Sequence, residues 1–159
     1  PLDPFHLSYK GREYNFWARF IELAGEINEQ MPHFVVTKVN SILNQEKKSI
    51  SNSKILVWGV SYKKDIGDVR ESAALDVIGD LIKKGSNVDY FDPHVKELEM
   101  GERELSTINY SPEILRQYDL VLILTDHSGF DYDEIAQNAN LVVDTRNAIK
   151  SRQFKNVHY

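Results

Sequence analysis

The sequence predicts an α/β protein: a mainly parallel sheet with helices on both faces, preceded by a long helical segment. Two patterns carry this prediction. Residues 5–46 contain no loop rich in Gly or Pro, and their apolar side chains recur at steps of three and four, as on one face of a helix. From residue 54 onward, short apolar runs alternate with amphipathic stretches across short connections, which is typical of a parallel sheet.

One apolar stripe runs along the helical segment. Its members are Phe20, Ile21, Leu23, Ala24, Ile27, Met31, Phe34, Val35, Val39, Ile42 and Leu43. Pro32 lies within the stripe and should either kink the helix or start a second one. So long a helix carries more apolar surface than a small domain needs. Two interpretations stay open: packing on the domain that follows, or a dimer or interdomain contact.

The next elements follow in order along the chain. Residues 45–53 are polar and turn-forming and predict a linker. Residues 54–60 form a nearly continuous apolar run, typical of a strand buried on both faces. Residues 75–82 show helical periodicity, and Lys83, Lys84 and Gly85 are the cations and glycine that end a helix. Residues 87–91 predict a second strand.

The last third repeats the alternation. Residues 111–117 predict a short helix with Ser111 as its cap and Pro112 in its first position. Residues 119–125 are the strongest strand of the chain, residues 131–138 a short helix and residues 141–144 another strand, and a last strand should begin at Val157. Residues 95–109 are expected to be the least ordered.

Composition excludes several classes of function. The 159 residues suffice for one domain, or for a small domain with an appended segment, and their net charge of −5 gives no basic footprint for nucleic acid. No apolar run approaches bilayer-spanning length. The absence of cysteine removes disulfides, thiolate metal sites and thiol nucleophiles, and fits the cytoplasm. The chain opens on Pro1 with a motif under way, so we expect an excised fragment.

Three loops should meet at one edge of the sheet. Residues 59–72, 125–130 and 144–148 each follow a predicted strand. Ligands of open parallel sheets bind at the carboxyl ends of the strands, where such loops gather. The sequence therefore predicts a binding site there.

The first of these loops is charged and is not a dinucleotide fingerprint, since Gly59 alone matches the glycines of that pattern. Lys63 and Arg70, beside a helix start that Ser72 or Asp68 would cap, predict a phosphate site. The alternative is a solvated surface loop in which Lys63, Lys64 and Arg70 pair with Asp65, Asp68 and Glu71. Arg146 follows another strand and favours the phosphate site, because its guanidinium can bind an anion with two hydrogen bonds.

Other candidates carry weaker signals. Asp92 ends a strand where an acid could hold a ribose, but Asp-Pro is more often a turn. The five histidines lack metal-ligand spacing, so we predict no metal and expect them at the surface or at caps. Trp17 and Trp58 are expected in a core or an interface.

In this order and spacing, several motifs are similar to those of the UDP-glucose/GDP-mannose dehydrogenase family. They are Pro1-Leu2-Asp3-Pro4, residues 20–28, Gly59-Val60-Ser61-Tyr62-Lys63-Lys64-Asp65, Asp68-Val69-Arg70-Glu71-Ser72, Tyr90-Phe91-Asp92-Pro93 and Asp144-Thr145-Arg146-Asn147. The resemblance implies that residues 1–48 end a central helical dimerisation segment. It implies that residues 49–159 form a C-terminal Rossmann-like domain that binds a UDP-sugar.

The resemblance also implies roles for single residues. Family members use two NAD to oxidise the C6 alcohol of a nucleotide sugar to a carboxylate, through a thioester on a cysteine. By this resemblance Asp3 is catalytic, Tyr62, Lys63 and Arg146 bind the substrate, and Arg70 reaches NAD. The cysteine would lie two residues before the chain begins, so we expect these residues alone to be inactive.

The resemblance further implies a cytoplasmic homodimer, formed through the long helix, that makes polysaccharide precursors. Leu2 stands where the UDP-glucose branch carries Lys, which favours the branch acting on UDP-N-acetylhexosamines. Gly67 and Ala73 also depart from the common family residues, without removing a charge used above. Two other functions stay open: a non-catalytic nucleotide-binding module and a dimerisation module.

Overall fold

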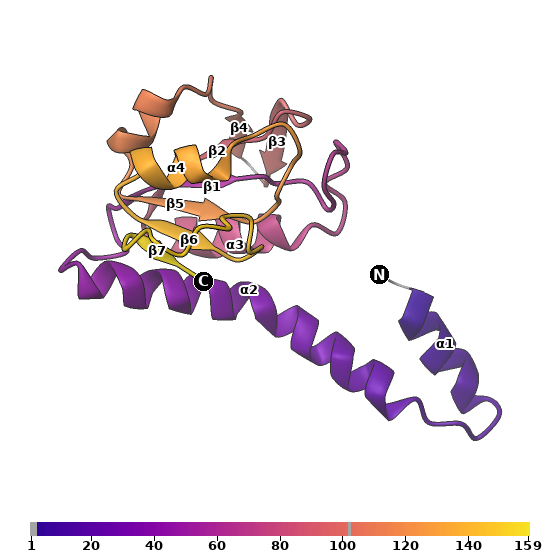
Figure 1. Cartoon of the computed structure of the whole chain (residues 1–159). Coiled ribbons are helices and arrows are strands. Elements are labelled where there is room, and N and C mark those ends of the chain that lie inside the picture. The colour runs from indigo at the N-terminus through magenta and orange to yellow at the C-terminus, as the bar shows by residue number, and fades with distance from the viewer. Residues whose placement is uncertain (1–2, 102) are drawn as a thin grey trace.

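The computed structural model describes residues 3–101 and 103–159 and centres on a five-stranded sheet (Figure 1). All neighbouring strands are parallel and the order is β2-β1-β5-β6-β7. The strands are β1 (Lys54–Trp58), β2 (Asn87–Phe91), β5 (Leu120–Ile123), β6 (Val142–Asp144) and β7 (Val157–His158). The predicted fold class is therefore confirmed.

Helices cover both faces of this sheet. Ile55 and Val57 of β1 pack with α2 (Arg19–Gln45) and α3 (Ala73–Lys83) on one face. Leu56 and Trp58 pack on the other face, with the 3-10 helix η1 (Pro112–Gln117) and α4 (Tyr132–Asn138). The alternation follows from the two-residue period of a strand, and burial on both faces explains the continuous apolar runs. Trp58 is thus a core residue, whereas Trp17 is exposed.

The strand order places a switch point between β1 and β5. From β1 the chain runs through α3 to β2 on one side, and it later returns to β5 on the other side of β1. Loops that leave neighbouring strands in opposite directions open a crevice at the carboxyl ends, which is where such sheets bind ligands.

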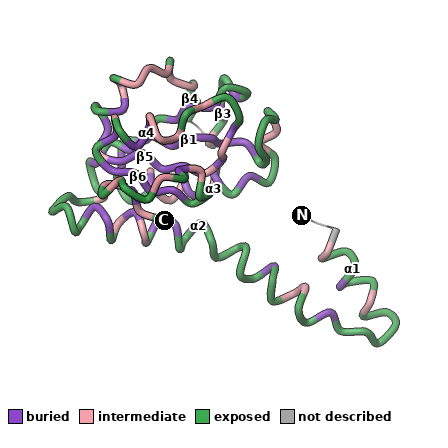
Figure 2. The backbone as a smooth tube through the Cα atoms, viewed as in Figure 1, coloured by how far each residue is buried: buried purple, intermediate pink, exposed green. Residues whose placement is uncertain are grey.

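Helix α2 continues through Pro32 without a break. Of the two alternatives for Pro32, the start of a second helix is wrong, and Figure 1 shows the helix changing direction part-way along. Its second half packs on the sheet through Val35, Val36, Val39, Ile42 and Leu43, while its first half extends away from the domain (Figure 2). Within the described residues, no helix is both long and apolar enough for a bilayer crossing.

The expectation of helix throughout residues 5–46 is wrong at residues 13–18. Helix α1 (Asp3–Arg12) ends there, and the Phe16 N–H donates to the Gly11 carbonyl oxygen at 2.9 Å. The chain turns at Asn15, whose φ of 57° lies in the left-handed region that Asn tolerates. Helix α1 then folds back on α2, where the Phe5 ring lies directly against Gly25.

Residues 95–109, expected to be the least ordered, contain regular structure that the sequence did not predict. Strands β3 (Glu97–Met100) and β4 (Arg103–Ser106) form an antiparallel hairpin. Leu98 is buried in the core shared with α2 and α3, and Tyr90 forms a bridge to Thr107. Four-residue strands with charged outer side chains give little apolar periodicity, so their sequence resembles a loop.

We expect Gly59→Ala to lower the free energy of unfolding by about 2 kcal/mol or more. Gly59 has a φ of 79°, and an added Cβ would lie 2.3 Å from the Thr125 carbonyl oxygen. Urea denaturation measures the loss. Gly101→Ala is the matched control, since Gly101 also has a positive φ but no atom within 4 Å of an added Cβ. Equal losses in the two variants would contradict the close approach at Gly59.

Candidate functional site

The three predicted loops meet at the carboxyl edge of the sheet. Thr125 donates from Oγ1 to the Ser61 carbonyl oxygen at 2.8 Å, which joins the loops after β1 and β5. The Arg146 Nε lies 3.5 Å from the Asp126 Oδ1, which joins the loops after β5 and β6. The prediction of one shared edge is therefore confirmed.

A cleft of about 660 Å³ opens at this edge, between the loops and the helices α1, α2 and α3. The loop after β1, Leu124 and Thr125 after β5, and Thr145 and Arg146 after β6 form one wall, with the first turn of α3. The opposite wall is made of Phe5, Gly25, Asn28, Glu29, Met31, Pro32 and Val35. The volume falls within the range of small-molecule sites.

Two of the predicted substrate residues, Tyr62 and Arg146, line this cleft. The Lys63 ammonium lies 5.2 Å from the centroid of the Tyr62 ring, within the range of a cation–π contact. The Arg146 side chain is half exposed, and its backbone N–H donates to the Asp144 Oδ1 at 3.0 Å. One cation, Arg146, and an aromatic hydroxyl, that of Tyr62, are thus available in the cleft, and Lys63 contacts the Tyr62 ring without lining it. Asp3 opens α1, and its side chain lies outside the described part of the chain.

Arg70 is placed differently. Its Nε and one terminal nitrogen bind both carboxylate oxygens of Asp68, and its side chain is 87% exposed. The hydrogen bond from Arg70 lowers the pKa of Asp68 to about 2. The Arg70–Asp68 ion pair is one of those expected if the loop is a solvated surface loop. Asp65 does not follow this expectation and instead contacts the loop after β5.

The first turn of α3 opens into the cleft. Ser72 caps the helix, because its Oγ accepts the Ala74 N–H at 3.3 Å and donates to the Val60 carbonyl oxygen at 2.7 Å. The alternative cap, Asp68, is wrong, since its carboxylate is held by Arg70. Ala73 and Ala74 line the cleft, so the positive end of this helix borders the space where an anion would bind.

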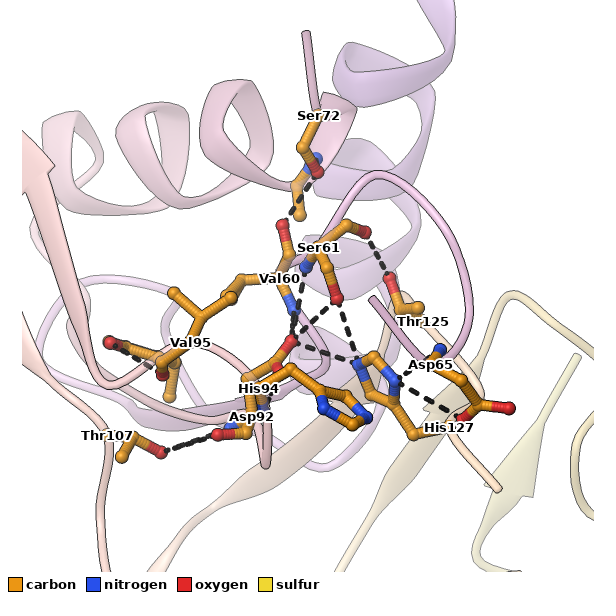
Figure 3. Close-up of polar contacts among 12 residues, drawn as sticks. Val60, Ser61, Asp65, Ser72, Asp92, His94, Val95, Thr107, Thr125 and His127 are labelled. Carbon is orange, nitrogen blue, oxygen red and sulfur yellow. Dashed lines mark hydrogen bonds and ion pairs between the residues drawn. The ribbon is translucent and has the colours of Figure 1, made fainter. Parts of the chain in front are cut away.

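Asp92 and His127, which carried only weak signals in the sequence, form a buried network behind the loop after β1 (Figure 3). Asp92 is 2% exposed and His127 is 1% exposed. The Asp92 Oδ2 accepts hydrogen bonds from the Val60 N–H at 2.8 Å and the Ser61 N–H at 3.2 Å, and it lies 3.0 Å from the His127 Nε2. The ribose interpretation of Asp92 is wrong, because its carboxylate is enclosed by donors of the chain itself. The turn interpretation is confirmed, since the Asp92 Oδ1 accepts the His94 N–H at 2.8 Å.

The surface or capping interpretation of His127 is wrong for the same reason. A useful signal was present: His127 lies in the loop after β5, at the edge where a site was predicted. Burial alone would raise the pKa of Asp92, but hydrogen bonds from Val60 and His94 and the neighbouring His127 lower it overall. Asp92 is therefore a carboxylate, and His127 is held beside a fixed negative charge.

Asp65, His94 and His127 each offer a ligand atom within 4.8 Å of the others. A metal here would need the Nδ1 lone pair of His127. That lone pair already accepts the Asp65 backbone N–H at 2.9 Å. The geometry therefore favours a hydrogen-bonded network over a metal centre at these three residues.

Comparison with known proteins gives the same family on three grounds. A family model described as the UDP binding domain of the UDP-glucose/GDP-mannose dehydrogenase family matches residues 56–151. A UDP-N-acetyl-D-mannosamine dehydrogenase of Methanococcus maripaludis is 35% identical over 97% of this chain. The chain spans 35% of that relative's length.

Solved structures agree. A UDP-D-ManNAc dehydrogenase from Pyrococcus horikoshii is 27% identical, with a TM-score of 0.69, over 85% of this chain and 32% of that one. A UDP-glucose dehydrogenase from Pyrobaculum islandicum is 23% identical, with a TM-score of 0.77, over 99% of this chain and 35% of that one. At that identity the second likeness shows the fold alone.

We expect Asp92→Asn to lower the free energy of unfolding at pH 7 by about 2 kcal/mol, because buried N–H donors lose a charged acceptor. Native Asp92 has a pKa below its ordinary 3.8, so its stabilisation is complete above pH 3.8 and is lost as the pH falls through the native pKa. The difference between variant and parent should therefore shrink in acid. Urea titrations at several pH values measure it, with exposed Asp76→Asn as control. A pH-independent difference would contradict the assignment of the charge to Asp92.

Proposed function

The chain belongs to the UDP-glucose/GDP-mannose dehydrogenase family, and from this premise we propose that it is the UDP-sugar-binding part of an NAD-dependent nucleotide-sugar 6-dehydrogenase. In this proposal residues 1–48 end a central helical segment, and residues 49–159 form the UDP-sugar domain. The intact enzyme would oxidise the C6 alcohol of a UDP-hexose or UDP-N-acetylhexosamine to the uronic acid, in the cytoplasm. The product would serve polysaccharide synthesis.

One observation carries the proposal: Tyr62, Arg146 and the first turn of α3 meet in a single cleft at the switch point. A diphosphate needs positive charge, which Arg146 and the positive end of α3 supply there. Lys63 lies beside Tyr62, and we propose that it supplies a second cation to the phosphates when the substrate is bound. The ring of Tyr62 adds an apolar surface on which a base or sugar can pack. Such residues position a substrate and do not themselves transfer a hydride.

The named relatives support an N-acetylated hexosamine as the sugar. The Methanococcus maripaludis and Pyrococcus horikoshii proteins are named for UDP-N-acetyl-D-mannosamine, and a further relative, from Salmonella typhi, is named for UDP-N-acetyl-D-glucosamine. The proposed substrate class is therefore a UDP-N-acetylhexosamine.

NAD itself does not fit the described residues. The two glycines of loop 59–72 lie against protein backbone, Gly59 against Thr125 and Gly67 against His94. Neither leaves the open backbone that a pyrophosphate requires. We therefore assign the main NAD site to another part of the enzyme, with the exposed Arg70 as the contribution of this chain. The thioester nucleophile also belongs elsewhere, since this sequence has no cysteine, and Asp3 is proposed to assist its hydrolysis as a general base.

The exposed half of α2 supports a homodimer. Phe20, Leu23, Ile27, Met31 and Phe34 are all exposed and recur at steps of three and four, so they form a second stripe away from the sheet. Phe20 is the most exposed of these five side chains, at 89%. The first interpretation of the long helix, packing on the domain that follows, holds for its second half. We propose that the first half packs against its copy.

We expect Arg146→Ala and Lys63→Ala each to weaken UDP binding by about tenfold or more, because each removes a cation from the phosphates. Isothermal titration with UDP and UDP-N-acetylglucosamine measures the affinity. Arg116→Ala is the matched control, since Arg116 is an exposed cation that precedes β5 at the opposite edge. If neither variant differs from the control, the assigned site is wrong.

We expect the double variant Phe20→Glu and Leu23→Glu to sediment as a monomer and the parent as a dimer, because charge on the stripe opposes its burial. Sedimentation velocity measures the two states. Asn44→Glu adds a charge at an exposed position of the second half of α2, outside the stripe, and should leave the dimer intact. A parent that stays monomeric at every concentration would refute the proposed assembly.

A further inference from the structure

Two buried side chains hold both ends of the segment that carries Tyr62 and Lys63, here called the Tyr62 loop (residues 60–65). At its start, the Asp92 Oδ2 accepts the N–H groups of Val60 and Ser61. At its end, the His127 Nδ1 accepts the Asp65 N–H at 2.9 Å. Figure 3 shows both holding points around one imidazole. Two of the three predicted substrate residues, Tyr62 and Lys63, therefore lie between two fixed ends.

The two holding side chains are also joined to each other. Because Nδ1 of His127 accepts a hydrogen bond, the ring proton is assigned to Nε2, which lies 3.0 Å from the Asp92 Oδ2. The Ser61 Oγ lies 3.0 Å from both of these atoms. Asp92 thereby fixes the tautomer and the ring orientation of His127, as a buried carboxylate does for other functional histidines. A change in either residue reaches both ends of the Tyr62 loop.

The conformation held in this way is not one that the backbone favours. Asp65 has a φ of 62°, in the left-handed region, which Asp visits more readily than most residues but which is still less favourable than right-handed or extended backbone. Its Oδ1 accepts the Ser128 N–H at 2.7 Å, a second contact with the loop after β5. The Tyr62 N–H also donates to the Asp68 carbonyl oxygen at 2.7 Å. Without the contact to His127, the end of the loop has less reason to stay in this conformation.

We propose that His127, oriented by Asp92, is a positioning residue for UDP-sugar binding, which it serves by holding the Tyr62 loop in its binding conformation. His127 is not among the residues that line the cleft, so it acts through the loop and not through the ligand. The proposal rests on the proposed function, because the ligand of Tyr62 and Lys63 is assigned there. A loop ordered before binding spares the ligand the cost of ordering it.

The test separates the two ring nitrogens of His127. His127→Leu removes both contacts, His127→Gln keeps a donor near the Nε2 position, and His127→Asn keeps an acceptor near the Nδ1 position. Tyr118→Phe is the matched control: it deletes a part-buried hydrogen bond, to Asp89 at 2.9 Å, at the opposite end of β5. Each variant is measured for amide hydrogen exchange without ligand and for affinity toward UDP.

In His127→Leu we expect exchange at residues 61–66 to rise about tenfold and UDP to bind about tenfold more weakly, as when a tenth of the molecules hold the binding conformation. The Gln and Asn variants should fall between Leu and the parent. Tyr118→Phe should change neither measurement at these residues, even where its stability loss is similar.

Each contrary result has one meaning. Exchange at residues 61–66 that is no faster in His127→Leu than in Tyr118→Phe overturns the holding role. Faster exchange with unchanged UDP affinity overturns the positioning role. If the parent itself does not bind UDP, the proposed function fails and the positioning role fails with it, while exchange still decides whether His127 holds the loop.

Discussion

The close approach of Gly59 to Thr125 is the constraint on which the rest of the site depends. Parallel strands β1 and β5 lie side by side, and the loops that follow them approach so closely that one backbone must lack a Cβ atom at the point of contact. Gly59 meets this requirement, with a positive φ and no Cβ, and the Thr125 carbonyl oxygen occupies the space that a Cβ would need. Ser61 and His127 then come within reach of Asp92. The cleft, the held loop and the helix start that faces the cleft all follow from this contact.

The Ser61–His127–Asp92 cluster has the residue types of a hydrolytic triad but not its connectivity. In such a triad the imidazole bridges serine and carboxylate through its two different nitrogens. Here both partners meet the same nitrogen, Nε2, and Nδ1 is taken by a backbone N–H. The Ser61 hydroxyl also donates to Asp92, so no lone base is left to activate it. The same three side chains therefore orient a loop where another arrangement would make a nucleophile.

Much of this fold was predictable from sequence because its strands are buried on both faces. The predicted strand at residues 87–91 matches β2 at both ends, and the shared edge of the three loops followed from the parallel order. The β3–β4 hairpin was missed because its short, charged strands give little apolar periodicity, and the turn after α1 was missed because it depends on one left-handed residue, Asn15, and not on Gly or Pro. The burial of His127 could not be predicted from spacing along the chain, because its partners Asp92 and Asp65 come from two other loops. The placement of Tyr62 and Arg146 at one cleft agrees with the prediction, whereas their roles stay predictions.

The direction of helix α2 affects the position of one wall of the cleft. Only its second half, from Val35 onward, is anchored in the core, while Gly25 and Asn28 of the free half form a wall of the cleft. Gly25 precedes the anchor by ten residues, a length of about 15 Å along a helix. A rotation of about 5° at the anchor would move that wall by about 1 Å, by the same geometry. The width of the cleft therefore depends on the angle at which the first half of α2 leaves the domain. A contact that fixes the N-terminal end of α2 would also fix the space available to a ligand.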